Sequence, residues 1–408
     1  MNLFPLYIDP GTGSALFSIL LGVAAALYFL GRALIIKLKV TFSGSKKAAS
    51  NVYPYVIYCE GRQYWNVFKH TVEAFERNKT ELRYLTSSAD DPVFDSQWTY
   101  VKPEFIGEGN KSFAYLNFLS AEFVLMTTPG LDVYQLKRSK SVKHYSHIMH
   151  ALTDAVTYRL FGLDYFDSIL LTGDFQKEDI RCLEKMRGLP EKRLVTVGCS
   201  YMDVYAEKMK TIPAETEHPF TVLVSPSWGA SSLLSLYGEK LLDPLAASGF
   251  RVIIRPHPQS KKSESAILER LETRYKGNNI IWDYDRENIF SLAKADIMIS
   301  DFSGIIFDYI CLCDKPVLYV NHDFDIRPYD ADDLDHELWQ FKTVKEAGIE
   351  LKEKDFPQIV SIIKNAHDSE SLSFARKKAG ETAWQCRGEA GKRIFEFMTD
   401  TVNGENKC

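Results

Sequence analysis

The chain has 408 residues, of which 45% are apolar and 25% are charged, so it is long enough for two domains and its composition excludes a disordered protein. Its formal net charge is −5, but the first fifty residues carry +4, which leaves −9 for the remainder. A body this acidic does not suit general binding to nucleic acid, and we expect no nucleic-acid partner. The seven cysteines form no CxxC pair and no zinc-ligand pattern, which argues against a disulfide framework.

The N-terminal region contains an uncharged run at residues 13–31, GSALFSILLGVAAALYFLG. At about 1.5 Å per residue this run makes roughly 28 Å of helix, close to the thickness of the bilayer hydrocarbon. We therefore predict one transmembrane helix within an anchor at residues 1–42. A cleaved signal peptide is a less favoured alternative, because no Lys or Arg precedes the run. A buried helix of a soluble protein is another, but it would have to be apolar on every face. All the basic residues of this region follow the run, so the positive-inside rule predicts a single-pass protein of the inner or plasma membrane with a cytoplasmic body.

After a polar linker, short apolar runs alternate with helical patterns, which predicts a mainly parallel sheet covered by helices. In residues 65–78 apolar side chains recur near the helical spacing. The runs that we interpret as strands of a first Rossmann-like, acceptor-binding domain at residues 50–212 are 52–59, 81–87, 122–128, 143–149, 165–172 and 193–198.

A second unit of the same kind follows a proline-containing linker at residues 211–219. We predict a nucleotide-binding Rossmann-like domain at residues 217–369, with strands at 220–226, 250–256, 279–284, 296–300 and 316–320. Residues 370–408 are predicted to be helical and to pack back toward the first domain. Two doubly wound α/β domains of this kind enclose a cleft at the carboxyl ends of their strands, where such sheets bind ligands.

The segment RPHP at 255–258 follows one predicted strand directly. Two prolines stiffen the loop around His257, and an imidazole beside Arg255 can donate hydrogen bonds to phosphate oxygens. We therefore expect both residues to contact an anionic ligand. The alternative is a histidine that only meets solvent or caps a helix.

Two further polar segments also follow predicted strands. In SDFSG, residues 300–304, we expect Ser300, Asp301, Ser303 and Gly304 to bind a phosphate at the start of the next helix, which Ser303 or Asp301 would cap. Capping alone is the competing interpretation. In SPSWG, residues 225–229, the hydroxyl groups of Ser225 and Ser227 and the glycine would let the backbone approach a ligand, with an ordinary turn as the alternative.

Three histidines, His144, His147 and His150, are spaced so that a helix would align them as a metal site, whereas a strand would turn His147 away from the other two. No acidic or cysteine ligand with metal spacing lies nearby, and we expect no metal there. His150, at a predicted strand end, is the candidate general base. The acidic loop at residues 322–337 lacks the spacing of a calcium loop, and we interpret it as solvated.

The segments HIMHA, SPSWG, RPHP, SDFSG, FDY and KPV occur in this order over roughly residues 145–320. Together they resemble the CDP-glycerol glycerophosphotransferases, which build or decorate polymers of the teichoic acid type. The family pattern places Trp and Gly around the first histidine, where this chain has Met149 and Ala151. It also has G-x-P-R-x-D where this chain has GCSYMD.

The resemblance implies a GT-B-like fold and transfer of an alcohol phosphate from a CDP-alcohol to an envelope glycan or lipid-linked acceptor, with release of CMP. His150 would act on the acceptor hydroxyl. His257 and Arg255 would stabilise the diphosphate, and the SDFSG segment would hold the nucleotide. No metal or other cofactor is implied. A nucleotide-sugar glycosyltransferase of the same architecture and an inactive membrane-tethered binding protein remain as alternatives.

Overall fold

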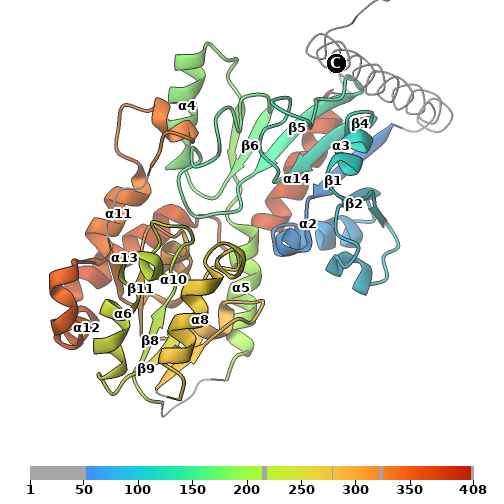
Figure 1. The fold of residues 1–408 in the computed structure, drawn as a ribbon. Helices are drawn as coiled ribbons and strands as arrows, with labels where there is room; N and C mark the ends of the chain where they lie inside the picture. The colour runs from blue at the N-terminus through green and yellow to red at the C-terminus, as the bar shows by residue number, and fades with distance from the viewer. Residues whose placement is uncertain (1–51, 214–217, 278, 321–324, 406–408) are drawn as a thin grey trace, which may run out of the picture.

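The structure, a computed structural model, describes residues 52–213, 218–277, 279–320 and 325–405. The predicted membrane span at residues 13–31 lies outside these ranges. Among the helices that are described, none combines the length and the apolar character needed to cross a bilayer. The described chain forms two α/β domains, with helix α5 running along the junction between them (Figure 1).

The first domain contains a seven-stranded sheet in which every neighbouring pair is parallel, in the order β3-β2-β1-β4-β5-β6-β7. Its strands are β1 (Tyr53–Cys59), β2 (Leu82–Thr86), β3 (Val101–Phe105), β4 (Ala121–Met126), β5 (Val142–Ile148), β6 (Ser168–Leu171) and β7 (Arg193–Thr196). The helices between them are α2 (Trp65–Arg77), α3 (Asn110–Leu116), α4 (Gln176–Arg187) and α5 (Ser200–Thr211), with short 3₁₀ turns η1 (Arg62–Tyr64) and η2 (Pro92–Asp95).

The second domain contains a six-stranded parallel sheet in the order β10-β9-β8-β11-β12-β13. Its strands are β8 (Thr221–Val224), β9 (Arg251–Ile254), β10 (Ile280–Trp282), β11 (Ile297–Ser300), β12 (Val317–Val320) and β13 (Ile349–Leu351). Its helices are α6 (Leu233–Ala246), α7 (Ser260–Ser263), α8 (Ser265–Arg274), α9 (Ile289–Lys294), α10 (Ile305–Cys313), α11 (Trp339–Ala347) and α12 (Ile359–His367), with 3₁₀ turns η3 (Asp330–Asp333) and η4 (Glu353–Gln358).

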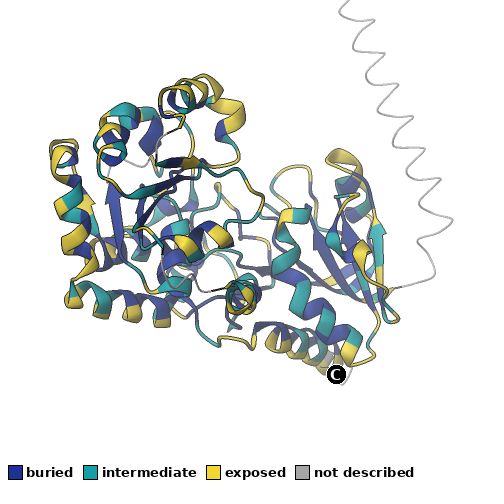
Figure 2. Ribbon diagram, turned by 90° about the horizontal axis from the view of Figure 1, so that it is seen from below, coloured by how far each residue is buried: buried dark blue, intermediate teal, exposed yellow. Residues whose placement is uncertain are grey.

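Apolar periodicity determines how the helices cover the sheets. Helix α2 buries Val67, Phe68, Val72 and Phe75 against β1 and β2, and this stripe is why the segment folds as an amphipathic helix. Figure 2 shows the strands of both domains as buried and the outer faces of the helices as exposed. Each sheet is therefore covered on both faces, as an all-parallel sheet requires.

Strands β3 and β13 were not predicted from the sequence. Both lie at an outer edge of a sheet. In β3 the sequence VKPEF has no apolar run and contains Pro103, which a strand tolerates at an edge because no further ladder bond is needed there. The strand β13 has only three residues, too few to give a pattern.

The C-terminal segment is shared between the domains. Helix α13 (Glu370–Ala383) packs against α10 and α11 of the second domain, whereas α14 (Ala390–Glu405) packs against α2 of the first. The buried carboxylate of Asp203, on α5, holds the turn between the two helices. It accepts hydrogen bonds from Trp384 Nε1 at 3.0 Å and from the amide of Gly388 at 2.7 Å.

In each sheet the strand order reverses beside the first strand, between β1 and β4 and between β8 and β11. Parallel α/β sheets bind ligands outside the carboxyl ends of their strands at such reversal points. The loops at the carboxyl ends of these strands and of their neighbours β5 and β9 are therefore the places to look for a site, and they include the predicted segments after β5, β8, β9 and β11.

Candidate active site

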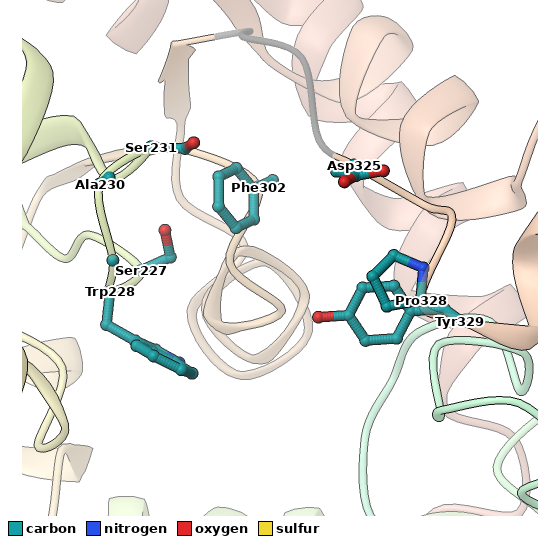
Figure 3. A pocket seen from close by; sticks show the side chains of 9 residues that line it. Ser227, Trp228, Ala230, Ser231, Phe302, Asp325, Pro328 and Tyr329 are labelled. Atoms are coloured by element: carbon teal, nitrogen blue, oxygen red, sulfur yellow. The ribbon is translucent and has the colours of Figure 1, made fainter. Parts of the chain in front are cut away.

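A cavity of about 380 Å³ opens at the carboxyl ends of β8, β11 and β12. Its wall consists of the loop from Ser227 to Ser231, Phe302 and the side chains of Asp325, Pro328 and Tyr329. Figure 3 shows Trp228 and Tyr329 on opposite sides of the cavity, with the ring of Phe302 between them. The cavity therefore lies at the strand-order reversal and has aromatic faces and polar groups suited to a nucleotide.

Asp301 fixes the loop that forms one wall of this cavity. Its buried carboxylate accepts the amide of Ser227 at 2.9 Å, the Ser227 hydroxyl at 2.9 Å and the amide of Leu233 at 2.9 Å. Because three donors converge on one carboxylate, the loop after β8 is tied to the loop after β11. The capping role expected for Asp301 or Ser303 is wrong, since α10 has no side-chain hydrogen bond at its N-cap, Gly304.

Ser225 and Ser300 are buried in the same loop junction. The Ser300 hydroxyl donates to the Ser225 carbonyl oxygen at 2.6 Å, and the Ser225 amide donates to Ile299 at 2.9 Å. These two serines position the loops around the cavity, whereas Ser227 lines it. Their predicted contact with a donor substrate stays a prediction.

Arg255 lies at the end of β9, and its guanidinium is engaged with neighbouring acidic residues. It donates to Asp283 Oδ2 at 2.6 Å and to the carbonyl oxygen of Asp285 at 2.6 Å. Burial alone would raise the pKa of Asp283, but hydrogen bonds from Ser291, from the Asp285 amide and from Arg255 together hold that pKa below its usual value. Arg255 therefore fixes the loop after β10, and any contact with a phosphate must use its remaining donors.

His257 lies beside the cavity. Its ring centroid is 6.2 Å from that of Trp228, and its Nδ1 accepts the amide of Gln259 at 3.1 Å. The side chain is exposed to solvent, yet surrounding protein atoms lower its pKa, and the carboxylates of Glu264 and Asp301 only partly oppose this. Because the backbone amide occupies Nδ1, Nε2 is the ring atom left to meet a ligand.

His150 lies two residues beyond β5 in the first domain. The ring of Tyr64 packs edge-on against it, with centroids 5.0 Å apart, and the Tyr158 hydroxyl lies 3.4 Å from its Nδ1. Burial lowers the pKa of His150 to about 4. The imidazole is therefore neutral at physiological pH, which is the state that a general base requires.

The strand interpretation is confirmed for His144 and His147, which β5 places on opposite faces of the sheet. It is wrong for His150, which lies beyond the strand and near His147, since the Tyr158 hydroxyl contacts both rings. His144 stacks on Phe123 at 4.7 Å, whereas His147 contacts Tyr158 and Phe166. A helical metal site is thereby excluded for this triple. Within the described ranges, one cluster of His, Cys and acidic side chains has its ligand atoms close enough together to share an ion. It consists of Cys182, Asp335 and His336, whose ligand atoms lie within 4.8 Å of one another.

The loop that follows His150 reaches the second domain. Thr153 lines a small cavity together with Asp301, Phe302, Ser303 and Gly304. A Cβ atom added to Gly304 would lie 3.2 Å from the methyl group of Thr153, so the two loops are in close contact. The segment containing the candidate base therefore adjoins the segment predicted to bind the donor.

The interpretation of residues 322–337 as a solvated loop is wrong for its second half. The Asp330 carboxylate is buried and accepts Arg187 at 2.7 Å and the amide of Phe161 at 2.7 Å. His336 Nε2 lies 2.9 Å from Asp179 on α4. This half of the loop joins the two domains, because its charges meet partners on the first domain.

Sequence reasoning missed the aromatic residues of the site, namely Tyr64, Tyr158 and Tyr329. Each stands in a loop or 3₁₀ turn, where no periodic pattern distinguishes a site residue from an ordinary surface residue. A signal was available only for Trp228, which lies inside the SPSWG segment.

Comparison with known proteins agrees with this geometry. The model of the family described as CDP-glycerol:poly(glycerophosphate) glycerophosphotransferase matches residues 46–338. No curated protein matches the chain. The solved wall teichoic acid polymerase TagF is 16% identical, with a TM-score of 0.58 over 93% of this chain and 98% of that one.

Two other solved structures are similar. A variant of TagF soaked with CDPG is 14% identical, with a TM-score of 0.60 over 93% of this chain and 97% of that one. A protein of Listeria monocytogenes described as a UDP-N-acetylglucosamine 2-epimerase is 12% identical, with a TM-score of 0.56 over 87% of this chain and 98% of that one. At these identities the likeness shows the fold.

Two parallel-sheet α/β domains that bring loops together from their carboxyl edges resemble the fold of the GT-B glycosyltransferases. Within that class, the chain belongs to the CDP-glycerol glycerophosphotransferase family and is an enzyme of that type. The predicted resemblance and the two-domain fold are thereby confirmed. The roles of individual residues are taken up below as proposals.

Proposed function

We propose that this enzyme transfers an alcohol phosphate, glycerol phosphate or a close analogue, from a CDP-alcohol to a hydroxyl group of a cell-envelope glycan or a lipid-linked acceptor. The observation that carries the proposal is the match to the glycerophosphotransferase family over residues 46–338. It is supported by the close contact between Thr153, in the loop after His150, and Gly304, in the loop after β11.

In the proposed reaction the acceptor hydroxyl oxygen attacks the phosphorus that carries the alcohol. One P–O bond forms, the phosphoanhydride bond breaks and CMP leaves. The proton of the hydroxyl passes to His150 and then to solvent. A neutral imidazole suits this step because it can take the proton as the new bond forms.

The donor is proposed to lie in the 380 Å³ cavity of the second domain, with its base between the aromatic side chains of Trp228 and Tyr329. Its diphosphate would then point toward His257 Nε2, the remaining donors of Arg255, and the polar groups of Ser227 and Ser303. Fixed hydrogen-bond donors of this kind stabilise the charge that develops on the leaving CMP.

The location of the enzyme is a proposal from the sequence. The uncharged run at residues 13–31, with basic residues only on its C-terminal side, supports a single-pass anchor with the two domains in the cytoplasm. With a cytoplasmic supply of CDP-alcohol, the donor and the lipid-linked acceptor would meet at the inner surface of the membrane.

A donor panel tests the function. The full-length protein is incubated with CDP-glycerol, CDP-ribitol, UDP-glucose and GDP-mannose in the presence of membrane extract, and the released nucleotide is identified by chromatography. We expect CMP from a CDP-alcohol, and only when acceptor is present. Release of UDP or GDP would replace the proposal by glycosyl transfer, and CDP-alcohol binding without any release would make the protein a binding protein.

A further inference from the structure

The hydroxyl group of Tyr158 lies between two histidines of the first domain. Its oxygen is 3.1 Å from His147 Nε2 and 3.4 Å from His150 Nδ1. The ring of Tyr158 is edge-on to His147 and tilted against His150, with centroids 5.2 and 5.9 Å apart. One hydroxyl group therefore joins a histidine of the β5 core to the candidate base at the end of that strand.

Neither histidine carries a charge under physiological conditions. Burial lowers the pKa of His147, with a further contribution from His150, and burial alone lowers the pKa of His150. Burial also raises the pKa of Tyr158, so its hydroxyl keeps its proton. A neutral imidazole has one N–H donor and one acceptor nitrogen, and a phenol has a single proton to donate.

These proton counts allow two directions for the chain of hydrogen bonds. In the first, His150 Nδ1–H donates to Tyr158, which donates to His147 Nε2. In the second, both bonds run the opposite way, and His150 then carries its proton on Nε2. Only the first direction leaves Nε2 of His150 with a lone pair that can take a proton.

The proposed role of His150 as base requires the first direction, which places the proton of His147 on Nδ1. The ring of His147 is fully buried, and its Nδ1 has no hydrogen-bond partner among the described residues. The same ring meets Phe166 in a T-shaped arrangement, with centroids 5.2 Å apart. Aromatic surroundings of this kind can accommodate an N–H, so the first direction is compatible with the packing of His147.

We infer that Tyr158, backed by His147, is the positioning residue of the catalytic base: it accepts the Nδ1–H of His150 and so keeps the lone pair of Nε2 available to the acceptor hydroxyl. This inference rests on the proposed role of His150. Tyr158 and His147 hold the tautomer of the base, as the carboxylate does in a Ser-His-Asp triad. Unlike a carboxylate, they add no negative charge to an already acidic protein.

The same arrangement stabilises the protonated base. When Nε2 takes the proton of the acceptor hydroxyl, Nδ1–H of the imidazolium already points at the Tyr158 oxygen, and the Tyr158 proton already points at His147. No hydrogen bond has to reverse during the step. When the proton leaves Nε2 for solvent, the chain returns to its starting state with every proton accounted for.

Nitrogen NMR of the ligand-free protein tests the direction without reference to activity. The full-length protein is labelled with ¹⁵N on histidine side chains, and two-bond ¹H–¹⁵N spectra report which ring nitrogen bears the proton. His147→Gln and His150→Gln variants assign the signals. We expect the Nδ1–H tautomer for both rings. An Nε2–H tautomer at His150 in the wild-type protein would overturn the inference outright, whatever the activity of the variants.

Tyr158→Phe tests the role in turnover, because it keeps the ring and removes only the oxygen. We expect the His150 tautomer to shift toward Nε2–H and kcat to fall about 10- to 100-fold, with the donor dissociation constant unchanged. Tyr145→Phe is the matched control. It also removes a buried hydroxyl from β5, one that accepts the amide of Ser139 at 3.1 Å rather than bonding to a histidine.

The outcomes separate this inference from the proposed function. If His150→Ala is inactive while Tyr158→Phe keeps full kcat and the wild-type tautomer, His150 is the base and Tyr158 does not position it. If His150→Ala keeps full activity, the base has been assigned wrongly and the role of Tyr158 falls with it. If Tyr145→Phe lowers kcat as much as Tyr158→Phe, the loss reflects packing, and the inference fails.

Discussion

The guanidinium of Arg187, on helix α4 of the first domain, donates to the carboxylate of Asp330, in the second domain, at 2.7 Å. The Asp330 side chain is 1% exposed and that of Arg187 is 10% exposed, so the pair is removed from water. Arg187 also donates to Asp164 at 2.7 Å and to Asp333. One arginine therefore joins carboxylates of both domains.

We predict that Arg187→Ala destabilises the protein by about 3–5 kcal/mol, because it leaves a buried carboxylate without its counter-charge. Urea unfolding followed by circular dichroism measures the loss, and the transition should separate into two as the domains uncouple. Lys354→Ala, an exposed charge on η4, is the control and should change little. A single unshifted transition for Arg187→Ala would mean that the pair contributes nothing to domain coupling.

Asp301→Ala should disorganise the loop after β8. It removes the acceptor of three hydrogen bonds from Ser227 and Leu233, and unpaired buried donors cost about 1–3 kcal/mol each. We expect a loss of at least about 2 kcal/mol in the free energy of unfolding and weaker donor binding by calorimetry. The exposed Asp368→Asn is the control. Normal donor binding by a folded Asp301→Ala protein would show that this loop does not form the donor site.

The two candidate histidines should fail differently when they are replaced. His150→Ala removes the proposed base, so single-turnover rates should fall about 10²- to 10⁴-fold while donor binding stays intact. His257→Ala removes a donor to the diphosphate, so binding should weaken by roughly 1–3 kcal/mol and turnover should fall as well. Calorimetry and rapid quench on both variants separate the roles. Unchanged donor affinity in His257→Ala would make the RPHP loop structural.

Asp308 should make stability depend on pH. Burial raises its pKa to about 7 from the ordinary 3.8, although a hydrogen bond from Tyr201 opposes this. Between these values the folded state holds a proton that the unfolded state has released, so the free energy of unfolding falls as pH rises from about 4 to about 7.

Asp308→Asn keeps an oxygen for Tyr201 but removes this titration. Relative to the wild type, the variant should therefore gain about 1–3 kcal/mol at pH 8 compared with pH 5, measured by urea unfolding at both values. Parallel pH profiles for the two proteins would mean that Asp308 stays ionised in the folded state.

Deletion of the N-terminal region tests the anchor. A chain that begins at Ser50 keeps every candidate site residue, so it should act normally on soluble acceptors and poorly on lipid-linked ones, since it loses only effective concentration at the membrane. Sedimentation with vesicles measures the difference in membrane binding.

A reporter fused at Cys408 should report a cytoplasmic location in the full-length protein. An external location would overturn both the predicted topology and the cytoplasmic donor supply.

The sequence predicted most of the fold because buried parallel strands are short apolar runs with abrupt polar ends. Those ends also placed three polar segments correctly: Ser225 and Arg255 directly follow β8 and β9, and Ser300 is the last residue of β11. The edge strand β3 was not predicted because Lys102 and Pro103 interrupt the run of apolar residues that marks a buried strand.

The missing parts of the site depend on contacts between distant residues. Asp301 lies 74 residues from Ser227, and no local pattern shows that its carboxylate binds a loop rather than a ligand. Tyr158 stands in a polar loop without periodicity, and only the folded chain brings it between His147 and His150. The partners of Asp330 were hidden for the same reason, so an acidic loop was interpreted as solvated.

The C-terminal helix α14 belongs spatially to the first domain, although the second domain precedes it in the chain. The polypeptide therefore crosses from one domain to the other twice, once after α5 and once between α13 and α14. Because two covalent connections join the domains, they favour relative rotation about the line that joins the connections. Rotation of one domain against the other about any other axis is resisted. It follows that a stop codon before Ala390 removes a wall of the first domain rather than a tail, and that the first domain cannot be expressed as one uninterrupted stretch of sequence.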